Sequence, residues 1–273
     1  MTAKIAFIGG GNMAKALIGG LINNGTSANR ITVADPSFEQ TEALREEFGV
    51  KVTADNAYAI LASDVVVLAV KPQIMADVCK GFVDAGTNLH GRLFISIAAG
   101  ISVARLKEML GNETHVVRTM PNTPALVGQG MTGLYAPEDV TEQQRELADS
   151  LMQAVGKTCW VEQEHEINHI IAAAGSAPAY FFLFMEAMQK QAEKLGFTPE
   201  QAREVVQQAA LGSTQLVAAN PDLDLATLRA NVTSKGGTTA EAIRVFQEQQ
   251  LEQIVANAMD AAIARALEME SLF

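Results

Sequence analysis

The fold of this chain is decided by its opening stretch, Ile5-Ala6-Phe7-Ile8-Gly9-Gly10-Gly11-Asn12-Met13-Ala14. The four apolar residues at its start are typical of a strand that is buried on both faces of a parallel sheet. Gly9 and Gly11 permit a tight turn and a close approach of the backbone to a pyrophosphate. Residues 12–24 have helical spacing and are followed by Gly25, which suits a left-handed helix end. A strand, a glycine turn and a helix start together predict an anion site.

The glycine turn follows the dinucleotide-binding pattern G-x-G-x-x-A, with Ala14 in the place of a third glycine. This pattern alone also fits any tight strand-to-helix turn. Its position ahead of a long series of alternating strands and helices favours the dinucleotide interpretation. We therefore expect the phosphates of a nicotinamide cofactor to lie against Ile8, Gly9, Gly10, Gly11, Asn12 and Met13.

Alternating strands and helices continue after the first helix. Strands are expected at residues 30–35, 50–52, 64–70, 93–97, 116–118 and 157–161, and helices at 37–48, 56–61, from 71 onwards, 102–110 and 141–155. This alternation predicts an α/β fold with a Rossmann-like, doubly wound parallel sheet. Strand patterns stop at about residue 164. We therefore expect a dinucleotide-binding Rossmann domain over residues 1–163 and an all-α dimerisation and substrate-binding domain over residues 164–273.

Ligands of such a sheet bind beyond the carboxyl ends of its strands. Asp35 ends the second strand, where an acidic side chain accepts a hydrogen bond from a ribose 2′-hydroxyl in dinucleotide-binding folds. A turn or capping role for Asp35 fits the sequence equally well. Contact with the hydroxyl favours NADH, whereas Ser37 at the next helix start offers NADPH a site for its 2′-phosphate. Lys71 is either a phosphate partner or a solvated side chain. The remaining cofactor-binding candidates at this edge are Asn56, Ala69, Val70, Pro72, Ala98, Gly100, Pro121 and Asn122.

Composition narrows the class of protein further. Of 273 residues, 48% are hydrophobic and 19% charged, and the net charge of −11 speaks against nucleic acid and anionic membranes as partners. Uninterrupted apolar runs such as residues 65–70 are shorter than the roughly 18 residues of a membrane span. No secretory signal pattern opens the chain, so we expect a cytoplasmic protein. Cys79 and Cys159 are expected to be buried thiols in a reducing compartment, and the histidines have no metal-ligand spacing.

The second part of the chain is helical by pattern. Ser176 and Pro178 open a helix through Lys194, in which residues 179–185 are apolar all round. A helix of this kind is buried on every side, yet a domain of about 110 residues has little interior for it. We therefore expect a second subunit to cover it. Thr198, Pro199 and Gln201 begin the next helix, which Gly212 interrupts.

A second anion site is expected at Ser234-Lys235-Gly236-Gly237-Thr238-Thr239-Ala240-Glu241. Two glycines precede a helix that Thr238 caps, with Glu241 three residues on. A loop whose backbone N–H groups point inward, together with the helix dipole, favours a bound anion, here a substrate carboxylate. The hydroxyls of Ser234 and Thr239 are in reach of a polar substrate atom. A plain glycine loop with a capping box explains the pattern equally well.

Five segments carry the marks of one enzyme family. They are Phe7-Ile8-Gly9-Gly10-Gly11-Asn12-Met13, Ala69-Val70-Lys71-Pro72, Met120-Pro121-Asn122-Thr123-Pro124, Gly175-Ser176-Ala177-Pro178-Ala179-Tyr180 and Val232-Thr233-Ser234-Lys235-Gly236-Gly237-Thr238-Thr239-Ala240-Glu241-Ala242. On these segments the chain resembles the pyrroline-5-carboxylate reductases along its whole length. Lys235 stands where many members carry proline and Ala177 where glycine is common. Neither departure removes a group that the chemistry needs.

The resemblance implies reduction of L-1-pyrroline-5-carboxylate, a cyclic imine carboxylate, to L-proline with NADPH or NADH, the last step of proline biosynthesis. It also implies a homodimer or a higher homo-oligomer formed through the C-terminal helices. By position in the family signature, Ser234, Gly237, Thr238 and Thr239 hold the substrate carboxylate. Thr239 is the catalytic residue, because its hydroxyl faces the imine nitrogen and orients it.

Two alternatives stay open at this point. The first is a Rossmann reductase of the β-hydroxyacid dehydrogenase type, which needs a catalytic lysine along a long helix. Lys235 lies before a glycine loop instead. The second is a dinucleotide-binding protein without activity, against which the hydroxyls of Ser234 and Thr239 speak. Only an assay separates it from an enzyme.

Overall fold

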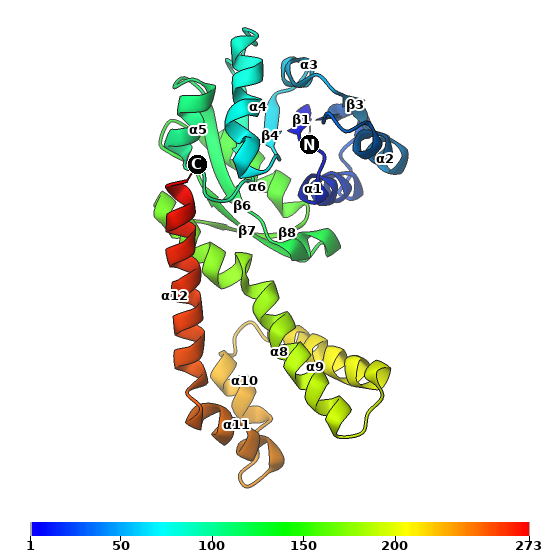
Figure 1. The fold of residues 1–273 in the computed structure, drawn as a ribbon, viewed down its shortest axis with the longest axis vertical. Helices are drawn as coiled ribbons and strands as arrows, with labels where there is room; N and C mark the ends of the chain where they lie inside the picture. The colour runs from blue at the N-terminus through cyan, green and yellow to red at the C-terminus, as the bar shows by residue number, and fades with distance from the viewer. Residues whose placement is uncertain (1, 273) are drawn as a thin grey trace. The chain divides into compact units, whose positions relative to one another are not determined.

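The computed structural model describes residues 2–272 and is built on one eight-stranded sheet (Figure 1). Its strand order is β3-β2-β1-β4-β5-β6-β7-β8. The strands are β1 Ile5–Ile8, β2 Ile31–Ala34, β3 Lys51–Thr53, β4 Val65–Leu68, β5 Leu93–Ser96, β6 His115–Met120, β7 Gly130–Tyr135 and β8 Gly156–Trp160. The order reverses at β1 between β2 and β4. This reversal is the topological switch point at which doubly wound sheets bind their ligands.

Helices cover both faces of the sheet, as the apolar strands predicted. They are α1 Asn12–Asn23, α2 Phe38–Phe48, α3 Asn56–Leu61, α4 Pro72–Asp84, α5 Val103–Leu110 and α6 Glu142–Gln153. Successive residues of a strand point to opposite faces. Ile5 and Phe7 of β1 accordingly join the core that includes Leu17 of α1, whereas Ala6 and Ile8 join the core that includes Met75 of α4. Burial on both faces explains why β1 carries no polar residue.

One strand of the sheet was not predicted from the sequence. β7 pairs antiparallel with β6 and parallel with β8, so the sheet is mostly, and not wholly, parallel. Two glycines weaken the strand pattern of β7. Both are required by close packing, because a Cβ at Gly133 would lie 2.8 Å from Ile170 and one at Gly130 would lie 3.0 Å from the carbonyl oxygen of Val155.

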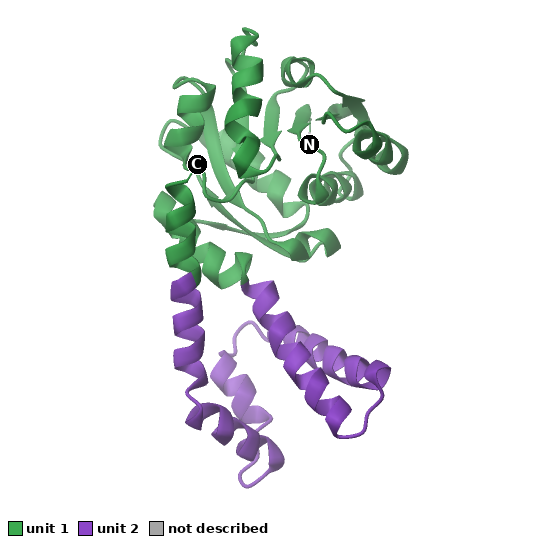
Figure 2. Ribbon diagram, in the orientation of Figure 1, with its two compact units in different colours: residues 1–176, 262–273 green, residues 177–261 purple. Residues whose placement is uncertain are grey.

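The chain divides into two compact units, coloured separately in Figure 2. Unit 1 comprises residues 1–176 and 262–273, and unit 2 comprises residues 177–261. The chain therefore passes from one unit to the other twice, each time within a run of helix. The predicted boundary between residues 163 and 164 separates a dinucleotide-binding domain from a helical domain. The division into compact units does not test this boundary, which stays a prediction.

A short helix that was not predicted precedes the helix expected to open at Ser176. α7 Ile167–Ile170 leads into a π-helical turn, η4 Ile171–Gly175, in which the N–H of Ser176 donates to the carbonyl of Ile171 at 2.7 Å. α8 then spans Ala177–Lys194. Single π turns of this kind occur frequently at functional sites.

The remaining helices are α9 Pro199–Ala219, α10 Leu225–Asn231, α11 Thr238–Glu248 and α12 Leu251–Glu270. The predicted start of α9 is confirmed, because Thr198 and Gln201 form a complete capping box. The predicted interruption at Gly212 is wrong. α9 continues through it, since glycine in a helix costs only about 1 kcal/mol relative to alanine.

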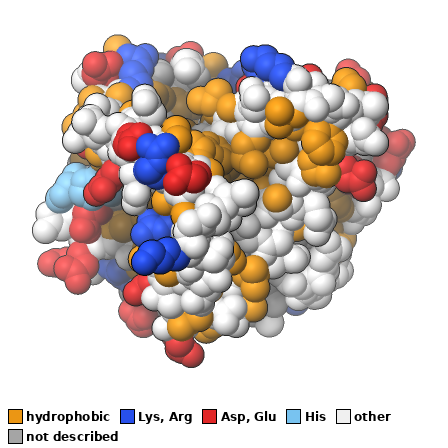
Figure 3. Space-filling view, turned by 90° about the horizontal axis from the view of Figure 1, so that it is seen from below, with side chains coloured by type: hydrophobic (Ala, Val, Ile, Leu, Met, Phe, Trp, Pro, Cys, Tyr) orange, Lys and Arg blue, Asp and Glu red, His pale blue; other side chains and the backbone are white. Residues whose placement is uncertain are grey.

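Unit 2 leaves an unusual amount of apolar surface uncovered. Phe181, Phe182 and Leu183 are each more than 60% exposed. Among the described residues 177–261, Ala202 and Val206 are the apolar side chains that are buried. Figure 3 shows one face of the molecule on which apolar side chains gather in patches between charged ones. Monomeric proteins rarely expose contiguous apolar patches of this kind.

One helical segment among residues 2–272, residues 164–194, is long and apolar enough to span a membrane by length and composition alone. The sequence count of uninterrupted apolar runs missed it, because asparagine, histidine, glycine and serine break the run without adding a formal charge. This observation is weak evidence for a membrane, since core helices of soluble proteins pass the same test.

The two cysteines differ in their surroundings, and one expectation about them is wrong. Both are free thiols, Cys79 buried on α4 and Cys159 exposed on β8. Cys159 was expected to be buried, but the residues of β8 alternate between exposed and half-buried positions. Burial raises the pKa of the Cys79 thiol to about 12. Cys79 is therefore a packing residue and not a nucleophile.

Candidate active site

The glycine turn after β1 has the geometry of a phosphate cradle. Gly9 has a φ of +103°, and a Cβ there would lie 2.7 Å from the carbonyl oxygen of Ala69. Gly11 caps α1 without any side-chain bond, and a Cβ at Gly11 would meet nothing within 4 Å. The first N–H groups of α1 thus keep their capacity to bind an anion. The space beside Gly11 and these N–H groups fit a pyrophosphate.

The carboxylate of Asp35 ties this turn to the next helix. One oxygen accepts a hydrogen bond from the Gly10 N–H and the other from the Ser37 N–H, each at 2.8 Å. The turn role that the sequence left open for Asp35 is therefore present. Each carboxylate oxygen retains a further lone pair, so contact with a ribose hydroxyl stays a prediction.

Ser37 is the N-cap of α2, as expected. Its hydroxyl accepts from the N–H of Gln40 at 3.4 Å, a long bond. Asn56 begins α3, which Asp55 caps, and it is half-buried. The positions of Ser37 and Asn56 agree with the sequence expectation, and their contact with the adenosine end of a cofactor stays a prediction.

The ends of β4 and β5 complete the same edge of the sheet. Ala69 and Val70 lie against the glycine turn, because the N–H of Ala69 donates to the carbonyl of Ile8 at 2.8 Å and Val70 is 3.0 Å from the Cβ position at Gly9. Lys71 is exposed and caps α4, and Pro72 is its first residue. After β5, Ala98 is buried and Gly100 has a φ of +73°. These residues lie at the carboxyl ends of β4 and β5, and their contact with a cofactor stays a prediction.

The side chain of Asn122 is engaged within the protein. Its Oδ1 accepts from the N–H of Met131 on β7 and its Nδ2 donates to the carbonyl of Ala174 in the π turn, both at 2.9 Å. Pro178 has no N–H for the carbonyl four residues before it, which is that of Ala174. Asn122 supplies the missing donor. Any cofactor contact of Pro121 and Asn122 is therefore expected through their backbone.

The predicted substrate loop joins α10 to α11. Gly236 has a φ of +69°, and a Cβ at Gly237 would lie 2.5 Å from the Ser234 hydroxyl oxygen. The prediction that Thr238 caps α11 is wrong. The helix starts at Thr238 with Gly237 as N-cap, and no side chain bonds its first turn. The capping serine or threonine that would occupy these N–H groups is absent, which leaves the helix start open to an anion.

The Gly237 N–H is not among the free donors, because it bonds the carbonyl of Ser234 at 3.0 Å. The N–H groups of Thr238 and Thr239 are the donors that the loop offers, together with the exposed hydroxyls of Ser234 and Thr239. Four donors of this kind suit a carboxylate and an orienting hydrogen bond. The one acid in the first turn of α11, Glu241, is paired with Arg244 at 3.0 Å.

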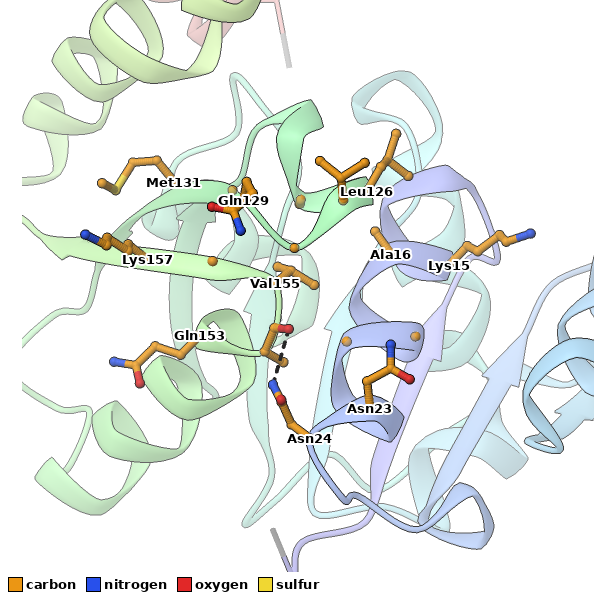
Figure 4. Close-up of a pocket in the computed structure, with 18 of the residues that line it drawn as sticks. Lys15, Ala16, Asn23, Asn24, Leu126, Gln129, Met131, Gln153, Val155 and Lys157 are labelled. Atoms are coloured by element: carbon orange, nitrogen blue, oxygen red, sulfur yellow. Dashed lines mark hydrogen bonds between the residues drawn. The ribbon is translucent and has the colours of Figure 1, made fainter. Parts of the chain in front are cut away.

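Two hollows of the described residues lie elsewhere. One of about 970 Å³ in unit 1 is lined by α1 and by the segments around Gln129 and Val155, where the amide of Asn24 donates to the carbonyl of Ala154 (Figure 4). The other, of about 1220 Å³, lies among α10, α11 and α12 of unit 2. Neither contains a predicted site residue. The glycine turn and the substrate loop stay the candidate sites, because each of them presents free donors.

A doubly wound sheet with an open glycine turn at its switch point defines a Rossmann-type dinucleotide-binding protein. Comparisons with known proteins narrow this class. Residues 4–100 match the family model for NADP oxidoreductase, coenzyme F420-dependent, and residues 164–269 match that for pyrroline-5-carboxylate reductase dimerisation. The chain belongs to the pyrroline-5-carboxylate reductase family.

Relatives and solved structures agree over nearly the whole chain. The chain is 58% identical to the pyrroline-5-carboxylate reductase of Vibrio alginolyticus, over 99% of this chain and 98% of the relative. Identity to the Escherichia coli enzyme is 36%, over 97% and 98%. The structure of a reductase from Coxiella burnetii matches with a TM-score of 0.93 at 43% identity, covering 98% of this chain and 99% of that one.

A structure from Plasmodium falciparum, a pyrroline carboxylate reductase with NADP bound, matches with a TM-score of 0.86 at 28% identity, covering 98% of both chains. The resemblance drawn from five short segments is thus confirmed over the full length. A reductase of the β-hydroxyacid dehydrogenase type is not favoured by these relatives.

Proposed function

We propose that this chain reduces L-1-pyrroline-5-carboxylate to L-proline with NADPH, and with NADH at lower efficiency. The observation that carries the proposal is the uncapped start of α11 behind Ser234, within a chain of this family. The glycine turn supports the cofactor assignment, because its open space beside Gly11 accommodates a pyrophosphate. When bound, the reduced nicotinamide supplies the hydride for the carbon of the C=N bond.

The residues of the substrate loop bind and orient the imine. The N–H groups of Thr238 and Thr239 and the hydroxyl of Ser234 hold the carboxylate, and the helix dipole of α11 favours its charge. The hydroxyl of Thr239 hydrogen-bonds the ring nitrogen and fixes the face of the C=N bond. A threonine is a poor acid, so its contribution is orientation, which alone supplies large rate effects. The proton that completes the secondary amine reaches the nitrogen from solvent or from the protonated imine itself.

We propose a homodimer as the smallest active form, with most of its interface in residues 164–269. The exposed apolar side chains of α8 and the match to a dimerisation family support this assignment. A second copy accounts for this surface better than a bilayer does, because the same helix also carries the exposed ion pair of Glu186 and Lys190. The free thiols Cys79 and Cys159 support a reducing compartment, so we place the enzyme in the cytoplasm.

The oligomer proposal predicts a dimer or a multiple of it in solution. An obligate interface usually buries more than about 2,000 Å². We expect light scattering to give at least twice the chain mass of 29.1 kDa at micromolar concentration. Leu183→Glu, which places a charge on the exposed apolar face, is expected to yield monomers, whereas Lys190→Glu at an exposed charged position of the same helix keeps the dimer. Monomeric wild-type protein contradicts the proposal.

The cofactor proposal predicts a shift in preference on removal of Asp35. We expect Asp35→Ala to raise the ratio of kcat/KM for NADPH to that for NADH by about tenfold, or 1.4 kcal/mol, because a carboxylate repels a 2′-phosphate. Both KM values rise as well, since the N–H groups of Gly10 and Ser37 lose their acceptor. Asp55→Ala, which removes only the cap of α3, leaves the ratio unchanged. An unchanged ratio in Asp35→Ala means that Asp35 is a turn residue only.

A further inference from the structure

An exposed aromatic side chain lies at the start of α2, next to the residues that tie this helix to the glycine turn. Phe38 is the first residue of α2, and it is 78% exposed. It belongs to neither of the two apolar clusters on the faces of the sheet, whereas Phe48 at the other end of the same helix packs against one of them. Buried aromatic side chains contribute strongly to packing, and Phe38 makes no such contribution. Its ring is therefore available to a ligand.

Hydrogen bonds fix this helix start against the glycine turn. The carboxylate of Asp35 accepts from the N–H of Gly10 with one oxygen and from the N–H of Ser37 with the other, each at 2.8 Å. A Cβ at Gly10 would also lie 3.1 Å from Leu44 of α2. All of these residues belong to unit 1. Phe38 directly follows Ser37, so its backbone is held one residue away from a contact of the glycine turn.

Two further exposed apolar side chains lie at the neighbouring helix starts. Tyr58 in the first turn of α3 is 56% exposed, and Ile74 in the first turn of α4 is 47% exposed. α2, α3 and α4 follow β2, β3 and β4, which flank β1 in the order β3-β2-β1-β4, so all three helix starts lie along the carboxyl edge of the sheet. A single exposed apolar residue needs no explanation, but three along one ligand-binding edge indicate an apolar surface for a ligand.

The adenine base is the part of a dinucleotide that matches such a surface. The glycine turn is assigned to the pyrophosphate, and Asp35 and Ser37 are assigned to the ribose and its 2′ group. The base is attached to the ribose carbon next to the one that carries the 2′ group, so it comes to lie beside the residues that follow Ser37. A purine presents two flat π faces, and aromatic side chains stack on such faces.

We propose that Phe38 binds the adenine base of the cofactor by stacking on one of its faces. This inference rests on the proposed function. Stacking is independent of the 2′ group, so Phe38 contributes equally to the binding of NADPH and of NADH, whereas Asp35 discriminates between them. The reacting carbon of the nicotinamide lies at the other end of the dinucleotide. Phe38 therefore contributes to cofactor affinity and not to kcat.

The test is Phe38→Ala, compared with Phe38→Tyr and Val83→Ala. Phe38→Tyr keeps an aromatic ring at this position. Val83 lies in the last turn of α4, at the opposite end of that helix from Ile74, and is also exposed, so Val83→Ala is the matched control for loss of an exposed apolar side chain. Calorimetry with adenosine 2′,5′-bisphosphate measures binding of the adenosine half alone, without catalysis. Fluorescence gives the dissociation constants of NADPH and NADH, and the melting temperature without ligand reports the fold.

We expect Phe38→Ala to raise the dissociation constant of adenosine 2′,5′-bisphosphate by about tenfold, because stacking of one base on an aromatic side chain is worth about that factor. The dissociation constants of NADPH and NADH rise by the same factor, so their ratio is unchanged. The value of kcat at saturating cofactor stays within about twofold of wild type. Phe38→Tyr and Val83→Ala match wild type throughout.

An unchanged dissociation constant for the bisphosphate in Phe38→Ala overturns the proposal. Equal weakening in Phe38→Tyr overturns it as well, because the ring is then not the group that binds. A changed ratio of NADPH to NADH affinity does the same, since it places Phe38 at the 2′ group.

Phe38→Leu decides the matter if Phe38→Ala is insoluble. Leucine keeps apolar bulk but has no π face, so we expect a rise of a few-fold in the dissociation constant of the bisphosphate. Wild-type affinity in Phe38→Leu then overturns the proposal. Wild-type protein that binds neither the bisphosphate nor NADPH, by contrast, refutes the proposed function itself.

Discussion

Gly11→Leu is expected to abolish measurable NADPH binding while leaving the fold intact. Gly11 has a φ of −69° and a ψ of −178°, which any residue adopts, and the space beside it is empty of protein atoms. A leucine there meets no neighbour, but it fills the volume that a pyrophosphate needs. We expect the NADPH dissociation constant to rise more than about 100-fold, or roughly 2.7 kcal/mol. The melting temperature without cofactor stays within about 2 °C of wild type.

Gly81→Leu is the matched control for this experiment. Gly81 lies in α4, also with nothing within 4 Å of its Cβ position, and leucine there improves helix propensity. We expect wild-type NADPH affinity in this variant. Retention of tight NADPH binding in Gly11→Leu means that the cofactor lies away from the glycine turn. Loss of the fold in Gly11→Leu means that a side chain at residue 11 meets other parts of the protein.

Thr239→Ala is expected to lower kcat by about tenfold to a hundredfold, with little change in NADPH affinity. A hydrogen bond to a charged or polar substrate atom is worth roughly 1.5–3 kcal/mol when its partner stays buried, which corresponds to that range. The backbone N–H of Thr239 survives the change, so the carboxylate keeps its anchor. Steady-state kinetics with saturating NADPH measures the effect.

Thr239→Ser separates the hydroxyl from the methyl group of the same side chain. We expect this variant to retain much of the activity, because the hydroxyl is preserved. Thr238→Ala provides the neighbouring control, since the Thr238 side chain does not cap α11 and only its N–H is assigned to the substrate. Equal losses in Thr239→Ala and Thr239→Ser indicate a packing role and contradict the orienting role.

The sheet was predictable because its signals are local. The buried strands β1 and β4 are continuous apolar runs, and several helix starts carry their own side-chain cap, such as Ser102 before α5 and Thr141 before α6. β7 escaped prediction because Gly130 and Gly133 serve contacts with Val155 and Ile170, which the pattern of β7 does not contain. Strand propensity depends on a residue and its neighbours in the sequence. These two glycines are required by packing against elements that are distant in the sequence.

Those parts of the candidate site that consist of one continuous segment could be predicted from the sequence. Contacts between several segments could not. The glycine turn and the substrate loop are each continuous, so their residues appear side by side in the sequence. The bonds of Asn122 reach Met131 and Ala174, and no local signal indicates the latter.

The central claim, that this chain reduces an imine carboxylate with a nicotinamide cofactor, is tested most directly by one assay. Oxidation of NADPH and of NADH is followed at 340 nm in parallel, with and without pyrroline-5-carboxylate. We expect substrate-dependent oxidation of both cofactors, stoichiometric formation of proline and a higher kcat/KM for NADPH. Absence of proline formation with either cofactor, from protein that is folded and dimeric, contradicts the claim.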